Sequence, residues 1–425
     1  MPIIQAVKGT RDFYPEQMAF RNWLHGQVRA VSERFGYQEW EAPYLESLDL
    51  YAAKSGEELV KEQAFTLTDK GGRVLALRPE LTPSLARMIA QRAAELTMPV
   101  RWYSFGPFWR YEQPQRGRAR EFFQWNIDLL GEAGVRADAE IIGVGVAFLK
   151  SVGLNAQQVV VKVNNRQFMQ QKLAAMGIAE TALTDCFNLI DRKPKMALKA
   201  WREYAATLGL SGAQVGSLER LLEDADAWRD FPPLAQLFAD LEALDAADMV
   251  AFDPTIVRGL LYYTGTVYEA NDAAGEYRAI LGGGRYDNLI ADVGGAPIPA
   301  TGFAMGDMVM ELVLEKYDCK PNLPTTHSAV LVTLFDDALY PQAARLATEL
   351  RRAGLNTELF LEPARLGKQI RFAQRKNIPV VAILGESEIA AGEVALKRLS
   401  TGEQVNVPRA EAPAQVRRWA AEAGS

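Results

Sequence analysis

The chain has 425 residues and a formal net charge of −6, with 48% hydrophobic and 24% charged residues. This composition is typical of a soluble globular protein with two or three domains. It has only two cysteines, Cys186 and Cys319, and two histidines, His25 and His327, which argues against a disulfide framework, a structural zinc site and a histidine-based catalytic triad. No segment reaches the roughly 18 apolar residues that a membrane span requires, so we expect no membrane partner and a cytoplasmic location.

The N-terminal third begins with a predicted helix over 16–35, where apolar residues recur at helical spacing before Gly36. An extended segment over 37–45 follows. We then expect a hairpin around the glycine pair 71–72 and a helix from Leu81, with a proline in its first turn.

A second hairpin is predicted between Val100 and Leu130, and its turn is rich in arginine. Four guanidinium groups fall within eleven residues: Arg110, Arg116, Arg118 and Arg120. Guanidinium groups bind phosphate or carboxylate through paired N–H groups, and they stack on aromatic rings. The segment is either an anion-binding element or a solvated charged loop, and its aromatic neighbours favour the first interpretation.

The central third changes character. After a helix at 137–152 and a strand at 159–163, the pattern is almost continuously helical from 165 to 249, which predicts an inserted helical subdomain. Strand patterns then return. We expect strands over 257–270 and 277–281, a turn at the glycine triplet 282–284 that opens a helix over 285–293, and a strand passing into a helix over 301–315.

A linker with several turn-forming residues, 320–326, marks a domain boundary. Beyond it, short apolar strands alternate with amphipathic helices, and a hairpin and a last helix follow. This order predicts a small doubly wound α/β domain over 327–425.

Three further motifs contain clustered polar groups. In Arg78-Pro-Glu-Leu-Thr82, Glu80 and Thr82 either receive an ammonium group or cap the following helix. Arg258 lies in an otherwise apolar strand pattern, which implies an anionic partner, either a ligand or a structural carboxylate. The glycines of GGGRYD (282–287) allow bare backbone to approach a ligand.

Together, RPELT, FWRYEQPQRGRAREFFQ, RGLLYYTGTVYE, LGGGRYDNL and GFAMG, in this order, resemble the histidyl-tRNA synthetase family of class II aminoacyl-tRNA synthetases. KGTRDF (8–13) is similar to the family's N-terminus. The segment that begins at Leu366 is similar to the family's anticodon-binding domain. The resemblance covers essentially the whole chain. It implies an α+β fold, with a class II antiparallel sheet flanked by helices in a catalytic core (1–165 and 250–320), a helical insertion (166–249) and a C-terminal α/β anticodon-binding domain (327–425).

The resemblance implies a histidine–tRNA ligase that activates L-histidine with ATP and Mg²⁺ and transfers it to tRNA(His). It also implies a homodimer, whose first class II motif corresponds to 20–51. The alternative is a non-catalytic paralogue, such as the histidine-sensing regulatory subunit of ATP phosphoribosyltransferase. Such subunits generally lack the C-terminal domain and lose catalytic arginines, whereas this chain retains both.

The resemblance also assigns site residues. For ATP it implies Arg110 at the α-phosphate, Glu112 at the adenine amino group, Arg118 at the outer phosphates, Phe122 stacked on adenine and Arg258 as a second catalytic cation at the α-phosphate. For histidine it implies Glu80, Thr82 and Gln124 around the α-ammonium, Arg110 and Arg258 near the carboxylate, Asp128 and Tyr263 at the imidazole, and Tyr262 beside them. It identifies no protein ligands for Mg²⁺.

The sequence departs from the family pattern at three positions: Asp128 replaces a glutamate, Leu261 an aspartate, and Val309 an arginine that binds the γ-phosphate. These changes resemble a divergent bacterial and plant-organellar branch of the family. We expect one of three other arginines to compensate for the last change: Arg118, Arg120 or Arg285.

Overall fold

The computed structural model describes residues 3–52, 62–257 and 262–423. The chain divides into two compact units. The larger consists of Met1–Asp12 with Arg21–Lys320, and the smaller of Phe13–Phe20 with Pro321–Ser425.

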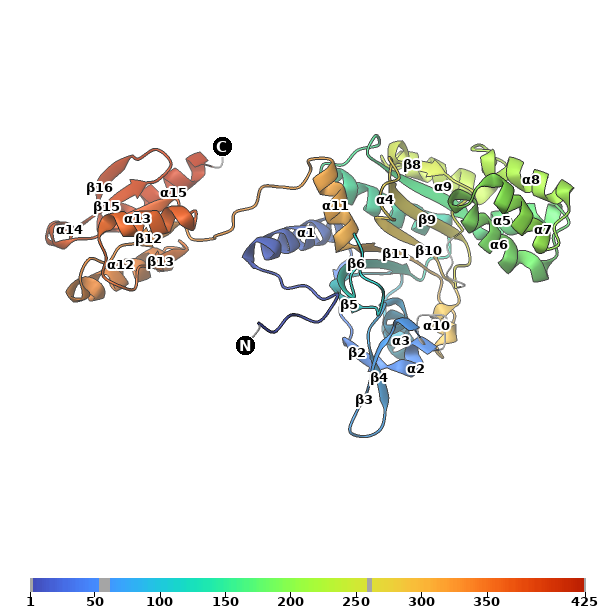
Figure 1. Ribbon diagram of the computed structural model, residues 1–425, viewed down its shortest axis with the longest axis horizontal. Coiled ribbons are helices and arrows are strands. Elements are labelled where there is room, and N and C mark those ends of the chain that lie inside the picture. Colours follow the sequence, from blue (N-terminus) through green and yellow to red (C-terminus); the bar gives the residue numbers. More distant parts are fainter. Residues whose placement is uncertain (1–2, 53–61, 258–261, 424–425) are drawn as a thin grey trace. The chain divides into compact units, whose positions relative to one another are not determined.

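An eight-stranded sheet forms the centre of the larger unit (Figure 1). In spatial order its strands are β1 (Gln38–Glu39), β5 (Val100–Trp109), β6 (Glu121–Leu130), β11 (Ala300–Gly306), β10 (Leu281–Arg285), β9 (Thr266–Asp272), β7 (Val159–Asn165) and β8 (Val250–Phe252). Pairing is antiparallel from β5 to β7, and only the two edge strands pair parallel to their neighbours. The expected class II sheet is therefore confirmed.

The arginine hairpin is confirmed as β5 and β6, which pair along their full length from Val100–Leu130 to Trp109–Glu121. The loop between them is narrowed by a bridge between Gln115 and Arg118. Gly117 at its turn has φ +76°, a conformation that suits glycine.

Helices and a small second sheet cover this core. The sheet has the order β2 (Leu45–Ser47), β4 (Val74–Leu77) and β3 (Phe65–Thr68). The helices are α1 (Pro15–Arg34), α2 (Leu48–Ala52), α3 (Thr82–Arg92), α4 (Val135–Ser151), α10 (Leu289–Asp292) and α11 (Asp307–Lys316). In Figure 1, α3 and α10 lie side by side below the sheet, and they are in contact.

The two faces of the sheet differ because successive side chains of a strand point to opposite sides. On one face, the odd-numbered residues Trp125, Ile127 and Leu129 of β6 are buried, and Trp125 packs on Phe148 of α4 with ring centroids 5.1 Å apart. The other face, here called the polar face, carries the even-numbered residues of β6 (Phe122, Gln124, Asn126 and Asp128) together with the residues paired to them.

The helical pattern of the insertion is also confirmed. It forms α5 (Arg166–Ala175), α6 (Leu183–Arg192), α7 (Leu198–Thr207), α8 (Gly212–Glu223) and α9 (Pro232–Ala243), with short 3₁₀ turns at Glu180–Ala182, Lys193–Lys195 and Ala247–Met249. Helices α5 to α8 gather beyond the β8 edge of the sheet, and α9 packs on α4 (Figure 1).

The expectation for residues 277–293 was wrong. The glycine triplet is not a turn but part of β10, which begins at Leu281, and the following helix, α10, covers only Leu289–Asp292. Glycine is required here because neighbouring strands crowd these positions: a Cβ at Gly283 would lie 2.1 Å from the Gly302 carbonyl oxygen. The preceding strand, β9, begins at Thr266 rather than at 257.

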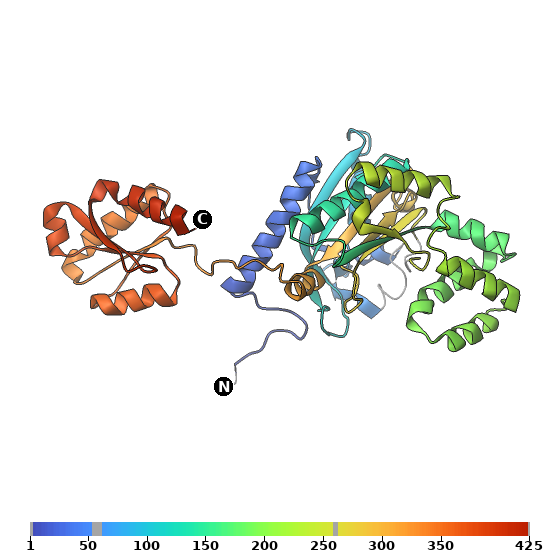
Figure 2. The same ribbon diagram turned by 90° about the horizontal axis from the view of Figure 1, so that it is seen from above.

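The smaller unit is the expected α/β domain. Its sheet has the order β13 (Thr357–Leu359), β12 (Val330–Val332), β14 (Val380–Ile383), β15 (Glu393–Arg398) and β16 (Gln404–Pro408). Its helices are α12 (Tyr340–Arg352), α13 (Leu366–Arg375), α14 (Glu386–Ala391) and α15 (Ala412–Ala423), with 3₁₀ turns at Asp337–Leu339 and Arg409–Glu411. Helices cover both faces of the sheet (Figure 2): α12 and α15 share one apolar core with it and α13 another.

No helix within the described residues combines the length and apolar character that crossing a membrane requires.

Candidate active site

Arg110 joins two of the motifs. It follows β5, and its Nε donates a hydrogen bond of 2.8 Å to the carbonyl oxygen of Pro79 in the RPELT segment. Its guanidinium carbon lies 5.4 Å from the ring centroid of Phe122, which projects from the polar face of β6. The arginine hairpin and RPELT are therefore in contact, and Arg110 lies between them.

The remaining hairpin arginines differ in their surroundings. Arg118 forms an ion pair with Glu112 in the same loop. Arg120 stacks on Tyr111, with 3.9 Å between guanidinium carbon and ring centroid, and donates to the carbonyl oxygen of Glu112 at 3.2 Å. Arg120 therefore supports the loop, and the expectation that it replaces the missing arginine is not supported.

The N-terminal KGTRDF segment is hydrogen-bonded to this hairpin. The carbonyl oxygen of Gly9 accepts hydrogen bonds from the backbone N–H groups of Arg120 and Glu121, at 2.8 and 3.1 Å. Arg11 forms an ion pair of 2.7 Å with the buried Asp307, whose second oxygen accepts from the backbone N–H of Phe123 at 3.0 Å. The segment thus links the loop to the start of α11.

In RPELT the first residue is structural. The Arg78 side chain has no exposure to solvent; it pairs with Glu41, and its Nε donates to the carbonyl oxygen of Pro107 at 3.0 Å. Helix α3 starts at Thr82 with Leu81 at the N-cap position, and no side-chain hydrogen bond caps it. The capping alternative for this motif is therefore wrong. Glu80 is buried and Thr82 half-buried at the helix start.

A buried carboxyl group and a phenol form a hydrogen-bonded pair on the polar face. Asp128 is 6% exposed and accepts a short hydrogen bond from the hydroxyl of Tyr286, the tyrosine of GGGRYD. Burial raises the pKa of the Asp128 carboxyl to about 7, and the hydrogen bond from Tyr286 opposes this rise. Sequence reasoning missed Tyr286, because only the pairing of distant strands brings it to Asp128.

Two glycines, Gly302 and Gly284, lie beside this carboxyl group and form a strip of bare backbone, here called the glycine floor. Asp128 pairs with Gly302 on β11, which in turn pairs with Gly284 on β10. A Cβ at Gly302 would lie 2.2 Å from an Asp128 carboxylate oxygen, and one at Gly284 would lie 2.8 Å from the ring of Tyr263. The two side chains expected at the imidazole, those of Asp128 and Tyr263, thus flank a strip of bare backbone.

One apolar cluster connects these parts. It contains residues from RPELT, the hairpin, the segment before β9 and GGGRYD, with two half-buried aromatic rings packed against it: Leu81, Phe108, Tyr263 and Tyr286, then Phe122 and Tyr262. Gln124 is half-buried on the polar face, paired with Gly106 and Gly306. Phe122, Gln124, Asp128 and Tyr263 therefore lie on, or next to, one face of the sheet.

Two predicted residues, Arg258 and Leu261, lie outside the described residues. The proposed compensation by Arg285 is wrong. This side chain forms an ion pair of 3.0 Å with the buried Asp138 and donates to the carbonyl oxygens of Glu132 and Gly134 at 3.0 and 2.9 Å. It is an odd-numbered residue of β10, so it projects from the face opposite to the glycine floor.

Arg278 is a further cation that sequence reasoning missed. Its pKa is lowered, first by partial burial of the charge and then by repulsion from Arg118 and Arg110, while Glu112 and Glu269 act in the opposite direction. These influences locate Arg278 at the hairpin loop. The sequence gives no signal for this position, which lies between two strands in an irregular segment.

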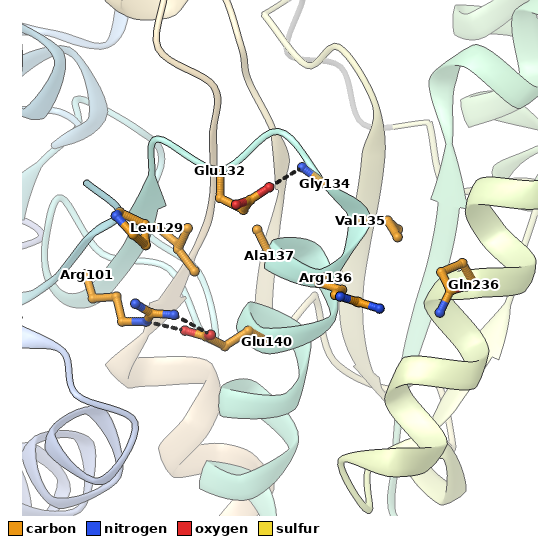
Figure 3. A pocket seen from close by; sticks show the side chains of 10 residues that line it. Arg101, Leu129, Glu132, Gly134, Val135, Arg136, Ala137, Glu140 and Gln236 are labelled. Carbon is orange, nitrogen blue, oxygen red and sulfur yellow. Dashed lines mark hydrogen bonds and ion pairs between the residues drawn. The ribbon is translucent and has the colours of Figure 1, made fainter.

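A separate cavity of about 560 Å³ opens on the other face of the sheet, between the start of α4 and α9 (Figure 3). Three of its four charged side chains, those of Arg101, Glu132 and Glu140, already have partners. Arg101 donates two hydrogen bonds to Glu140, at 2.7 and 2.8 Å, and Glu132 accepts from the backbone N–H of Gly134 at 2.8 Å. It contains none of the predicted site residues.

Over the part of the chain that the structure describes, no group of three or more His, Cys, Asp or Glu side chains is arranged to hold a metal ion. The acidic groups that act on Arg278 are Glu112 and Glu269, and the latter accepts a hydrogen bond of 2.9 Å from Asn271.

The antiparallel sheet, its arginine hairpin and the helix that follows β11 define the catalytic domain of a class II aminoacyl-tRNA synthetase. Residues 9–308 match the profile of the family described as histidyl-tRNA synthetase, and residues 328–419 match that of an anticodon binding domain. The chain belongs to the histidyl-tRNA synthetase family.

Individual relatives agree. A chloroplastic/mitochondrial histidine–tRNA ligase of Arabidopsis thaliana is 39% identical over 413 residues, covering 94% of this chain and 84% of its own. A histidine–tRNA ligase of Haloarcula marismortui is 37% identical over 423 residues, covering 96% of each chain. The crystal structure of histidyl-tRNA synthetase from Nostoc sp. superposes with a TM-score of 0.84 at 26% identity, over 98% of this chain and 100% of the other.

Proposed function

We propose that this protein is a histidine–tRNA ligase, which uses ATP to convert L-histidine to histidyl-adenylate and then transfers the histidyl group to tRNA(His). The observation that carries the proposal is the meeting, on one sheet face, of the Arg110 hairpin with the buried Asp128–Tyr286 pair and Tyr263. The arginines of the hairpin suit a triphosphate, and the Asp128–Tyr286 pair with Tyr263 suits a small polar ring.

In the first step a histidine carboxylate oxygen attacks the α-phosphorus of ATP, and the bond to pyrophosphate breaks. The enzyme contributes mainly position and positive charge to such a reaction, so arginines suffice. We assign Arg110 and Arg258 to the α-phosphate and carboxylate, and Phe122 to stacking on adenine. Glu112 and Arg118 pair with each other here, so ATP has to exchange part of this ion pair for contacts with the adenine amino group and the outer phosphates.

For the amino acid, we assign Glu80, Thr82 and Gln124 to the α-ammonium group. Asp128 and Tyr263 read the two ring nitrogens of the imidazole, with Tyr262 beside them. A site whose buried polar groups need these partners rejects amino acids that lack them. In the second step a terminal ribose hydroxyl of tRNA attacks the histidyl carbonyl, and AMP leaves.

We further propose that ATP enters as its Mg²⁺ complex, so that the ion arrives as part of the substrate. The core (1–165 and 250–320), insertion (166–249) and anticodon-binding domain (327–425) are proposed as the working parts of a cytoplasmic homodimer. Exposed apolar side chains around the β2–β4–β3 sheet support a partner surface near the first motif: Tyr44, Leu45, Leu67 and Val74.

ATP–pyrophosphate exchange tests the proposed activity. We expect exchange that depends on histidine, and esterification of tRNA(His) by the same preparation. Binding of histidine without exchange would contradict the proposal and would instead indicate a regulatory paralogue. Histidinol, which has no carboxylate, serves as the negative control because it cannot form the adenylate.

Removing residues 327–425 separates the two steps. We expect charging of tRNA to fall by at least about 100-fold, because the phosphate and base contacts of a separate domain contribute several kcal/mol of tRNA affinity. Histidine-dependent exchange should change by less than about threefold. Equal losses in the two assays, in a truncated protein that remains folded by circular dichroism, would contradict separate duties for the domains.

A further inference from the structure

We propose that Arg278 is an additional phosphate-binding residue and that its guanidinium contacts the outer phosphates of ATP. The inference rests on the proposed function and deepens it, since it names the cation that takes over from the arginine missing at Val309.

Position 309 carries an uncharged side chain, Val309, which lies next to the hairpin loop. Val309 is 8% exposed, and a Cβ built on Gly117 at the turn of the hairpin loop would lie 3.5 Å from one of its methyl groups. The same Cβ would lie 3.5 Å from Leu312, one turn further along α11. Valine therefore gives the loop an apolar support in place of a charge.

A second segment reaches the loop from β9 and β10. The Tyr277 hydroxyl lies 3.4 Å from an Nη of Arg116, whose guanidinium carbon is 5.4 Å from the centroid of the tyrosine ring. Arg278 is the next residue. Contact between Arg116 and Tyr277 thus ties the hairpin loop to the segment that carries Arg278.

The charges around Arg278 leave a positive excess. Arg118 and Arg110 both repel the charge of Arg278, and the two carboxylates that act on Arg278 in the opposite direction are Glu112 and Glu269. Glu112 is engaged by Arg118. Across residues 3–52, 62–257 and 262–423, no hydrogen bond or ion pair holds the Arg278 guanidinium, so its donors are available to a ligand.

This arrangement suits a polyphosphate better than a carboxylate of the protein. Guanidinium groups bind phosphate oxygens through paired N–H donors, and several converging arginines repel one another until an anion of high charge arrives. Because Arg110 is assigned to the α-phosphate and Arg118 lies further along the loop, a cation beside both fits the β- and γ-phosphates.

The test compares ligands that contain or lack these phosphates. For Arg278→Ala we expect kcat/KM for ATP in the exchange reaction to fall by about 10- to 100-fold, the usual range for losing a hydrogen bond to a charged group. The KM for pyrophosphate in the reverse reaction should rise by a similar factor. Affinity for a sulfamoyl analogue of histidyl-adenylate, which lacks the outer phosphates, should change by less than about twofold. Arg278→Lys should recover only part of the loss.

Arg202→Ala is the matched control, because Arg202 is a surface arginine of the insertion that pairs with Glu219 at 2.6 Å. It should leave all three measurements unchanged. Unaltered ATP kinetics for Arg278→Ala, or equal loss of affinity for ATP and the adenylate analogue, would overturn the assignment. Direct calorimetric binding of ATP and of the analogue separates this failure from failure of the proposed function, since it does not require exchange activity.

Discussion

Replacing Arg110 with alanine is expected to lower histidine-dependent ATP–pyrophosphate exchange by about 10²–10³-fold, mostly in kcat, because the variant lacks the preorganised cation that we propose acts where charge develops on the α-phosphate. The side chain is preorganised by its 2.8 Å hydrogen bond to the Pro79 carbonyl oxygen and by the ring of Phe122. Steady-state exchange at several ATP and histidine concentrations gives kcat and both KM values.

Two variants control this result. Arg110→Lys keeps the charge but loses the planar fork, so it should recover only part of the activity. Arg73→Ala removes an exposed arginine that pairs with Asp69 at 2.7 Å in the β3–β4 hairpin, and it should behave as wild type. Near-normal exchange by Arg110→Ala would contradict the assigned role. If Arg110→Ala has a melting temperature so low that it is largely unfolded under assay conditions, the loss of activity would instead indicate that the hydrogen bond to Pro79 is mainly structural.

Much of the architecture was predictable from local patterns. The hairpin β5–β6 follows from two aromatic and β-branched runs around a turn, and the insertion follows from its helical period. These signals are local, since each strand or helix carries its own pattern. Phe122, Gln124 and Asp128 also share one face for a local reason, because even spacing in a strand puts side chains on the same side.

The failures have a common physical cause, which is tertiary register. Three successive glycines look like a turn in sequence, but at Gly283 the close approach of β11 requires the absence of a side chain within a strand. The same register brings Tyr286 to Asp128 and places Arg285 on the opposite face with Asp138. Arg278 has no motif of its own, and only the folded loop contact at Tyr277 brings it to the hairpin.

At pH 8, above the pKa of about 7 of the Asp128 carboxyl, Asp128→Asn is expected to raise the KM for histidine by about 10- to 100-fold with a smaller change in kcat. The substitution removes a charged hydrogen-bond acceptor from the proposed imidazole site while preserving its shape. The KM for ATP should stay within about twofold of wild type. An unchanged histidine KM would contradict the role of Asp128 in reading the ring.

The same variant should change how stability depends on pH. The pKa of the buried Asp128 carboxyl is raised to about 7, whereas an unfolded aspartate titrates near 3.9. Between these values the folded state holds a proton that the unfolded state has lost, so the free energy of unfolding falls as pH rises through this window, by roughly 4 kcal/mol in total. Asparagine does not ionise, so the free energy of unfolding of Asp128→Asn does not fall for this reason as pH rises. Relative to wild type, Asp128→Asn should therefore gain stability between pH 5 and pH 8, as measured by denaturant unfolding.

Tyr286→Phe provides the directional control for this titration. Its hydroxyl donates to the Asp128 carboxylate and opposes the rise in pKa, so its removal should raise the pKa of Asp128 further and extend the destabilising window to higher pH. The stability of Tyr286→Phe should then fall more steeply than that of wild type above pH 7. Parallel pH curves for wild type and both variants would mean that Asp128 is already ionised in the folded protein at pH 5. The site would then hold a permanent carboxylate for the imidazole rather than a carboxyl that titrates near neutral pH.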